Sequence, residues 1–286
     1  MKKNTVSIAG IDISFLYGNE WNEPGVGDNT NPGKETDGIE LKVHHGPLPD
    51  MGPRDIIFDS GSTWALFRSG NIYVLQNNPL GPSSTPDIFV VLNSNLTAGD
   101  IFLDYEPSDT TNFSDPLGWP LYQILMIFLL SFNRGILFHA CGIVDRGNGY
   151  LFLGNSGHGK TTMARLWKEN QCSVLNDDRI IVREKGGRFW MYGTPWHGDL
   201  ADWSLKGVPI RKMFFLVAGT KNSAIPKGGV EAVSMILKRS FPPIWDENGM
   251  AYEMDLCDRL VEKIPCYELQ FEPDKRIVDF VRGLSD

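Results

Sequence analysis

Residues 1–115 consist largely of short segments in which hydrophobic and polar residues alternate. Successive side chains of a strand point to opposite faces of a sheet, so this period of two predicts β-strands. Turn-forming residues such as Ser60-Gly61-Ser62 separate them. Residues 20–40 contain few apolar side chains and many Gly, Pro, Asn and Asp residues, which predicts a loop. The strands are expected at residues 5–8, 11–15, 55–58, 64–67, 72–75 and 88–92.

The longest apolar run of the chain, Trp119–Phe132, predicts a buried helix over residues 117–132. Pro120 suits the first turn of a helix, and Asn133-Arg134-Gly135 supplies a stop signal. A helix that spans a bilayer needs about 20 apolar residues, so we expect no membrane association. No apolar targeting segment follows Met1, which favours a cytoplasmic location.

Beyond residue 135 the pattern changes to short apolar strands that alternate with helix-forming segments. This alternation is typical of α/β proteins. The predicted fold class is therefore α/β, with a β-rich region at residues 1–115 and a second domain at residues 116–286. Strands are expected at 136–144, 150–153, 173–176, 179–182, 188–192, 212–217 and 267–271, and helices at 161–168, 229–240, 252–263 and 273–282.

Composition and charge narrow the classes of partner. The chain has 286 residues, of which 42% are hydrophobic, and this content excludes global disorder. The net charge is −8, which argues against nucleic acid as the main partner. Residues 1–115 hold 6 basic and 16 acidic residues, and residues 116–286 hold 21 and 19. A nucleotide site is therefore better placed in the second domain. The four cysteines show no paired spacing, which excludes a zinc ribbon and a disulfide scaffold.

One motif in the second domain indicates phosphate chemistry. Residues 154–161 match the G-x-x-x-x-G-K-T pattern of the phosphate-binding loop, also called Walker A, between an expected strand and an expected helix. The glycines allow successive backbone N–H groups to point at a phosphate, and the helix that follows adds its dipole. Lys160 would reach the β- and γ-phosphates, and the Thr161 hydroxyl would bind Mg²⁺. The predicted nucleotide-binding residues are Gly154, Asn155, Ser156, Gly157, His158, Gly159, Lys160, Thr161 and Thr162.

A pair of carboxylates follows the next expected strand. Asp177 and Asp178 come directly after residues 173–176. Acids at the end of a strand suit Mg²⁺ coordination and general-base chemistry. Arg211 is a candidate clamp for the γ-phosphate, because a guanidinium offers planar, two-point contact. These residues, with ATP and Mg²⁺ as cofactors, predict phosphoryl transfer.

Three segments together resemble the catalytic core of HPr kinase/phosphorylase. These are the strand around His139, the phosphate loop, and Asp177-Asp178-Arg179 with its flanking apolar residues. The resemblance covers about residues 135–217 and implies a fold akin to phosphoenolpyruvate carboxykinase, with ATP-dependent phosphorylation of a protein serine. It implies that Asp178 is the base, that Asp177 binds or supports the metal (or that these two roles are exchanged), and that His139 tunes both acids.

The chain also departs from that family. Thr162 occupies a position where the family usually has an acid, which leaves the reverse, phosphorylase reaction open. Residues 1–115 do not resemble the family's usual amino-terminal domain, and no signature for gripping HPr follows residue 217. The acceptor therefore need not be HPr, and the pattern is closer to the HPr-kinase-related proteins found with peptide biosynthesis.

Several functions remain to be weighed against the sequence. The leading interpretation is a kinase that transfers the γ-phosphate of ATP to a serine, or another hydroxyl, of a peptide or protein. A nucleotide-hydrolysing switch would need a longer apolar strand before a single Asp, and residues 173–176 match this poorly. A non-catalytic nucleotide-binding module would leave Asp177 and Asp178 without a role. The sequence is compatible with a homo-oligomer.

Overall fold

The computed structural model describes residues 2–18, 37–77, 87–104, 115–217 and 219–285. The chain divides into two compact units, Met1–Met126 and Ile127–Asp286. The sequence predicts a domain boundary after residue 115. This boundary stays a prediction, because a division into compact units does not test whether either part folds or functions by itself.

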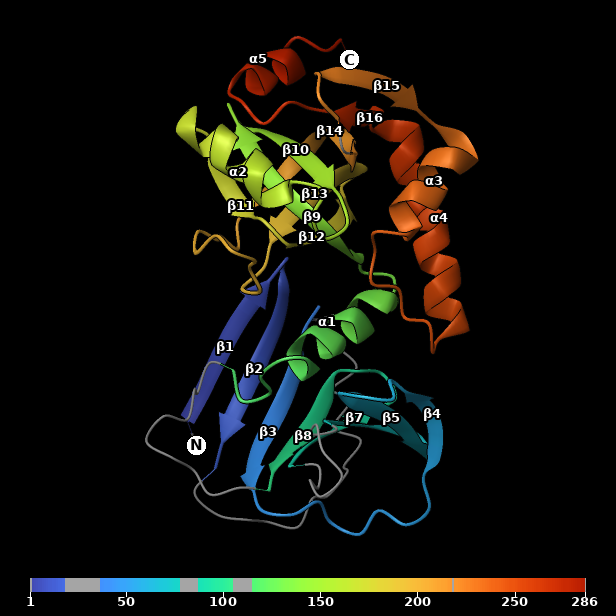
Figure 1. Ribbon diagram of the computed structural model, residues 1–286. Helices are drawn as coiled ribbons and strands as arrows, with labels where there is room; N and C mark the ends of the chain where they lie inside the picture. The colour runs from blue at the N-terminus through green and yellow to red at the C-terminus, as the bar shows by residue number, and fades with distance from the viewer. Residues whose placement is uncertain (1, 19–36, 78–86, 105–114, 218, 286) are drawn as a thin grey trace. The chain divides into compact units, whose positions relative to one another are not determined.

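The first unit is built on one eight-stranded sheet with the order β1-β2-β3-β8-β7-β6-β5-β4 (Figure 1). Strand β3 pairs in parallel with both β2 and β8, and the other neighbours are antiparallel. The strands are β1 (Lys2–Ile8), β2 (Ile11–Tyr17), β3 (Ile39–His45), β4 (Asp55–Asp59), β5 (Trp64–Ser69), β6 (Ile72–Asn77), β7 (Ile88–Asn93) and β8 (Ala98–Leu103).

This sheet confirms the six strands expected in the first part of the chain and adds β3 and β8. The loop predicted for residues 20–40 is wrong at its end, because β3 begins at Ile39. Ile39, Leu41 and Val43 alternate with polar residues and are buried, as a half-buried strand requires. Residues 20–36 of that predicted loop lie outside the described residues.

Helix α1 (Leu121–Ser131) confirms the helix expected from the longest apolar run. It begins directly after Pro120 and ends before Asn133, which adopts a left-handed φ of 58°. Most of its side chains are buried, in agreement with their apolar character. In the part of the chain that the structure describes, no helix is long and apolar enough to span a membrane.

The second unit contains a sheet with the order β10-β9-β12-β13-β14-β16-β15, to which β11 is added by pairing with β9. Strand β14 also pairs in parallel with β10. The pairings of β10, β9, β12, β13 and β14 therefore form a closed ring. The elements are β9 (Ile136–Asp145), β10 (Asn148–Leu153), α2 (Lys160–Glu169), β11 (Ser173–Asn176), β12 (Arg179–Lys185), β13 (Arg188–Gly193), β14 (Gly207–Val217), β15 (Ser223–Lys227), α3 (Gly229–Leu237), α4 (Glu247–Lys263), β16 (Cys266–Gln270) and α5 (Arg276–Arg282).

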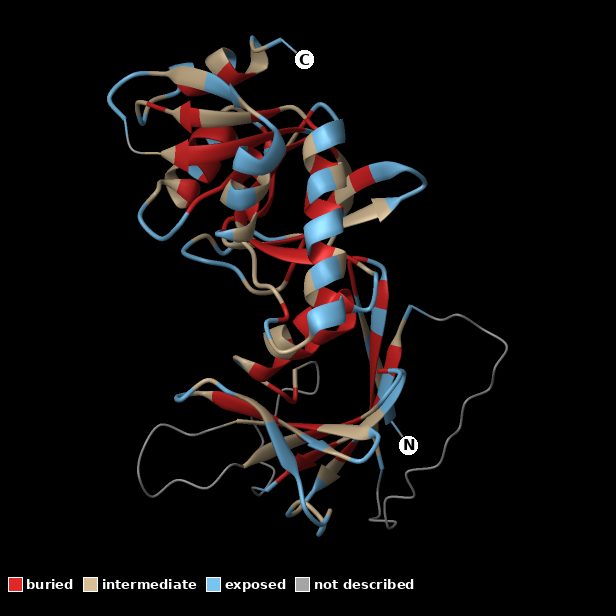
Figure 2. Ribbon diagram, turned by 90° about the vertical axis from the view of Figure 1, so that its right-hand side faces the viewer, coloured by how far each residue is buried: buried red, intermediate tan, exposed pale blue. Residues whose placement is uncertain are grey.

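Helices cover this sheet on both faces (Figure 1). On one face Phe152 and Phe214 pack with Trp167 of α2, in a core that includes residues of α5. On the other face Leu153 and Phe215 belong to the core formed with α3 and α4. Buried and exposed residues alternate along α4 with helical spacing (Figure 2). The structure thus confirms an α/β second unit with helices on two faces of a mixed sheet.

Some boundaries differ from those predicted. Strand β14 begins at Gly207 rather than residue 212, because its first residues pair with β13 before the strand reaches β10. Helix α4 begins at Glu247 rather than residue 252, since Asp246 caps it by accepting a hydrogen bond from the N–H of Asn248. Strand β15 was not predicted.

Candidate functional site

The phosphate-loop motif lies between β10 and α2, as its sequence context predicts. Gly157 and Gly159 have φ angles of 81° and 86°, which glycine adopts without steric cost. A Cβ atom at Gly159 would lie 2.8 Å from the ring of Phe271. The two glycines therefore shape a turn that places Lys160 at the first position of α2. The first N–H groups of a helix have no partner within it and suit an anion.

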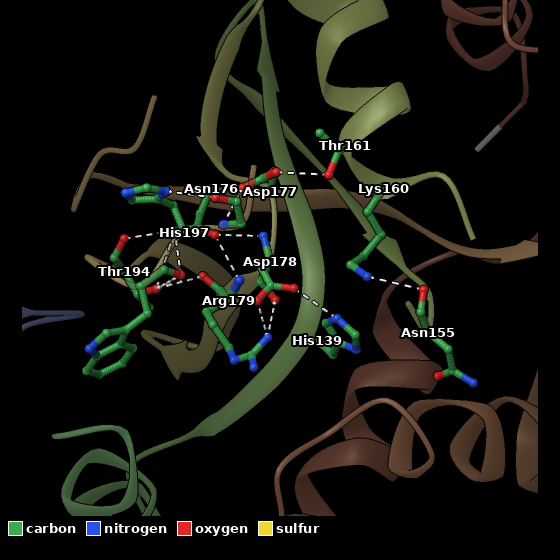
Figure 3. A network of polar contacts seen from close by, with 12 residues as sticks. His139, Asn155, Lys160, Thr161, Asn176, Asp177, Asp178, Arg179, Thr194 and His197 are labelled. Carbon is green, nitrogen blue, oxygen red and sulfur yellow. Dashed lines mark hydrogen bonds and ion pairs between the residues drawn. The ribbon is translucent and has the colours of Figure 1, made fainter. Parts of the chain in front are cut away.

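Lys160 lies across this turn. The residue is 7% exposed, and Nζ donates to the carbonyl oxygens of Gly154 at 2.9 Å and Asn155 at 3.3 Å (Figure 3). Burial lowers the pKa of Lys160, and the negative charge of Asp178 acts in the opposite direction. The ammonium group is thus held at the loop, near the acid pair, by carbonyl groups that a phosphate oxygen could replace.

Asp177 connects the phosphate loop to the strand that follows α2. The Thr161 hydroxyl donates to one Asp177 oxygen at 3.0 Å. The N–H groups of Gly198 and Leu200 donate to the two carboxylate oxygens at 2.8 and 3.3 Å. Only 1% of Asp177 is exposed. A hydroxyl and a carboxylate oxygen so close together are the hard oxygen ligands that Mg²⁺ prefers, and these two residues fit the predicted metal site.

Asp178 forms a second polar group on the same turn. One carboxylate oxygen lies 2.9 Å from Nε2 of His139, and the other accepts a hydrogen bond from Arg179 (Figure 3). Burial acts to raise the pKa of Asp178, but the hydrogen bond from His139 and the charge of Arg179 outweigh it and lower the pKa. The Arg179 guanidinium carbon lies 4.4 Å from the centroid of the Phe241 ring. Asp178 is therefore a half-buried carboxyl group with both oxygens in polar contacts and a pKa below its ordinary value.

Asn176, which is not among the site residues expected from the sequence, holds the turn that carries both acids. It is fully buried, and its Oδ1 accepts from the N–H groups of Asp178 at 2.7 Å and Arg179 at 2.8 Å. Its amide donates to the carbonyls of Thr194 at 2.9 Å and Trp196 at 3.1 Å. An Asn directly before two acids at a strand end was the available signal, since Asn side chains often bond to the backbone of a turn.

The structure brings together most residues that the sequence predicted for this site. Lys160, Thr161, Asp177, Asp178 and His139 converge where β10 and β11 end. Among the other predicted nucleotide-binding residues, Asn155, Ser156 and Gly157 are exposed, and Thr162 is half-buried in the first turn of α2.

His158 has a role in the loop that the motif does not reveal. Its Nδ1 lies 2.9 Å from the carbonyl oxygen of Leu216, so that the side chain fastens the loop to β14. His197, by contrast, is exposed and contacts only the carbonyl oxygen of Gly198 among the hydrogen bonds found in the described residues.

Arg211 does not join this group, and the predicted clamp role requires correction. It is exposed and lies near the start of β14, between Ile210 and Lys212, which pair with Gly149 and Tyr150 of β10. The phosphate loop instead follows Leu153, which pairs with Phe215. Four residues of strand separate the two positions, or about 13 Å. The sequence could not show this register.

No cluster of three or more His, Cys, Asp or Glu side chains suited to a metal ion occurs among the described residues. The four cysteines are all buried and free. Burial raises the pKa of Cys172 to about 11 and the pKa values of Cys257 and Cys266 to about 12. The thiols are therefore protonated near neutral pH and are poor nucleophiles.

No protein-family model matches this chain, and no curated protein matches it. Among solved structures, the chain is similar to an Hpr(Ser) kinase/phosphatase from Coxiella burnetii. The sequence identity is 11%, the TM-score is 0.31, and the match covers 51% of this chain and 95% of the other. A likeness at this level assigns no family.

Proposed function

We propose that this protein is an ATP-dependent phosphotransferase that moves the γ-phosphate of ATP to a serine, or another hydroxyl, of a peptide or protein. The observation that carries the proposal is the hydrogen bond between Thr161 of the phosphate loop and Asp177 of the acid pair. This bond supports the proposal because it joins the phosphate-loop motif to the acid pair. Neither motif alone would indicate a kinase.

The phosphate loop would hold the nucleotide through backbone N–H groups and Lys160. Thr161 and Asp177 would hold Mg²⁺, which neutralises charge on the β- and γ-phosphates when it is bound. Phosphoryl transfer depends mainly on positioning and on charge stabilisation. Burial of Lys160 and Asp177 strengthens their electrostatic effect, because water screens them little.

Asp178 would accept the proton of the attacking hydroxyl. Its pKa lies below the ordinary value, so near neutral pH the carboxylate can accept a hydrogen bond from that hydroxyl. His139 holds one of its oxygens, and Arg179 holds the other. A positioned general base typically contributes roughly 10²–10⁴-fold to the rate. A binding module or a simple nucleotide switch would have no use for this second acidic group, which favours transfer to a hydroxyl.

The test is transfer of label from ATP in an extract of the source cells. With Mg²⁺ and ATP labelled at the γ-phosphate, we expect a labelled peptide or protein whose hydrolysis yields phosphoserine. ATP labelled at the α-phosphate should leave no label, because a kinase does not transfer the nucleotide. Release of free phosphate without a labelled acceptor would favour a hydrolysing switch. Binding of ATP without turnover would favour a non-catalytic module.

A further inference from the structure

Arg239 is a buried cation beside the phosphate loop that the proposed chemistry does not yet use. It follows α3, and 9% of the residue is exposed. One terminal nitrogen, Nη1, donates to the carbonyl oxygen of Met235 at 2.8 Å. Nε has no hydrogen-bond acceptor among the described residues. Burying a donor without a partner is costly, so an unused N–H on a buried guanidinium indicates a missing acceptor.

The backbone of His139 places Arg239 next to the loop. The N–H of His139 donates to the carbonyl oxygen of Arg239 at 2.8 Å, and the carbonyl of His139 accepts from the N–H of Gly154 at 3.4 Å. The N–H and C=O of one strand residue point to the same edge. Arg239 and Gly154, the first residue of the loop, are therefore neighbours along one edge of β9. The bridge between Phe138 and Ser240 continues this pairing.

The side chain of Arg239 also lies near the end of β10. Its guanidinium carbon is 5.7 Å from the centroid of the Phe215 ring, and Phe215 pairs with Leu153, the last residue before the loop. Burial lowers the pKa of Arg239, and the charge of Glu268 acts against this effect. Glu268 also lies 3.6 Å from Lys227, so its charge is shared between two cations. Arg239 thus has less negative charge around it than a buried cation normally requires.

We propose that Arg239 binds the terminal phosphate of the nucleotide held by the phosphate loop and makes the site distinguish ATP from ADP. This inference rests on the proposed function. A guanidinium is suited to the task, because its donors can contact two oxygens of one phosphate. Arg239 would then perform the role that the sequence assigned to Arg211, which lies at the other end of β10.

The test compares the affinity of variants for Mg·ADP and for a non-hydrolysable Mg·ATP analogue by calorimetry. Arg239→Met should weaken binding of the ATP analogue by roughly 10- to 100-fold, the effect of removing a hydrogen bond to a charged group. Binding of ADP should change less than about threefold, since the terminal phosphate is absent. The matched control is Arg211→Met, which removes an exposed arginine at the far end of β10 and should change neither affinity.

The outcomes separate this inference from the function on which it rests. Equal affinity of wild type and Arg239→Met for the ATP analogue, or an equal loss for both nucleotides, would overturn the role of Arg239 alone. A wild-type protein that binds neither nucleotide would overturn the proposed function. If Arg239→Met does not fold, Arg239→Lys provides the same test. It keeps the charge but not the two-point contact, and it should lose part of the preference for the ATP analogue while it binds ADP normally.

Discussion

The hydroxyl of Thr161 donates a hydrogen bond to the carboxylate of Asp177 at 3.0 Å, across 16 positions of sequence. This contact joins the first turn of α2 to the end of β11. Gly198 and Leu200 donate to the same carboxylate, so Asp177 links three segments of the chain. A ligand that changes the contacts of Asp177 will therefore affect the phosphate loop and residues 198–200 together.

Lys160→Ala should weaken the affinity for Mg·ATP at least tenfold. The substitution removes the buried ammonium group at the loop, and a hydrogen bond to a charged group contributes about 1.5–3 kcal/mol. Calorimetric titration with a non-hydrolysable ATP analogue measures the effect. The matched control is Lys168→Ala near the end of the same helix, where the lysine is exposed and pairs with Asp202. Unchanged affinity in Lys160→Ala would contradict the assignment of the phosphate loop.

Gly159→Ala and Gly157→Ala form a second matched pair. Both glycines have left-handed φ angles, so either alanine costs about 1 kcal/mol of backbone strain. A Cβ at Gly159 would also meet the Phe271 ring at 2.8 Å, whereas nothing lies within 4 Å of a Cβ at Gly157. We therefore expect Gly159→Ala to lower both stability and nucleotide affinity more than Gly157→Ala does. Thermal unfolding with and without nucleotide measures both effects, and equal effects would argue against the described turn.

Asn176→Ala should destabilise the second unit by roughly 3 kcal/mol or more. The change leaves the N–H groups of Asp178 and Arg179 without this acceptor and the carbonyl of Thr194 without this donor. Each unsatisfied buried group costs about 1–3 kcal/mol. Urea unfolding gives the difference in free energy. Asn148→Ala serves as the control, because that amide is exposed and makes one long hydrogen bond of 3.4 Å. A loss for Asn176→Ala no larger than for the control would show that Asn176 does not hold the acid-bearing turn.

Glu253 should make stability fall as pH rises. It is 1% exposed, both carboxylate oxygens lack hydrogen-bond partners among the described residues, and burial raises its pKa to about 9. Between the ordinary pKa of 4.5 and about 9, the unfolded chain releases this proton while the folded protein keeps it. The unfolded state then binds fewer protons, so stability decreases with rising pH, by up to about 1.4 kcal/mol per unit.

Glu253→Gln removes that titration and should be more stable than wild type at pH 8, with a smaller difference at pH 5. Urea midpoints at both values measure it. Glu262→Gln, an exposed substitution on the same helix, should follow wild type at both pH values. A Glu253→Gln protein whose stability tracks wild type across this range would show that the carboxyl is ionised in the folded state.

The features that the sequence predicted are those that a short stretch of residues determines by itself. The phosphate loop and α2 follow from glycines and a helix-forming run within a few residues, and Asp177 and Asp178 from their place after an apolar strand. The sequence did not allow us to predict which residues strand pairing brings next to the loop. Arg211 was chosen for its chemistry, yet the pairing of β14 with β10 places it at the far end of the strand. Arg239 lies beside the loop only because residues 239–241 pair with β9.

The strands of the first unit show the same limit. Ile39–His45 alternates as a strand should, but its neighbours are rich in turn-forming residues, and the prediction extended the loop over its first positions. Strand β3 is stabilised by parallel pairing with β2 and β8, which are distant in sequence. Pairing with strands that are distant in sequence decides whether such a segment forms a strand. The residues of the segment alone do not reveal this pairing.

The most direct test of the central claim is the fate of the γ-phosphate in wild type and in Asp178→Asn. Both proteins should bind a non-hydrolysable Mg·ATP analogue with similar affinity, because Asp178 contacts His139 and Arg179 rather than the phosphate loop. With labelled ATP and cell extract, wild type should transfer the label to a serine-bearing acceptor. Asp178→Asn should lose roughly 10²–10⁴-fold of that rate. Undiminished transfer by Asp178→Asn would contradict its role as base, and the absence of any labelled acceptor with wild type would contradict the assignment as a kinase.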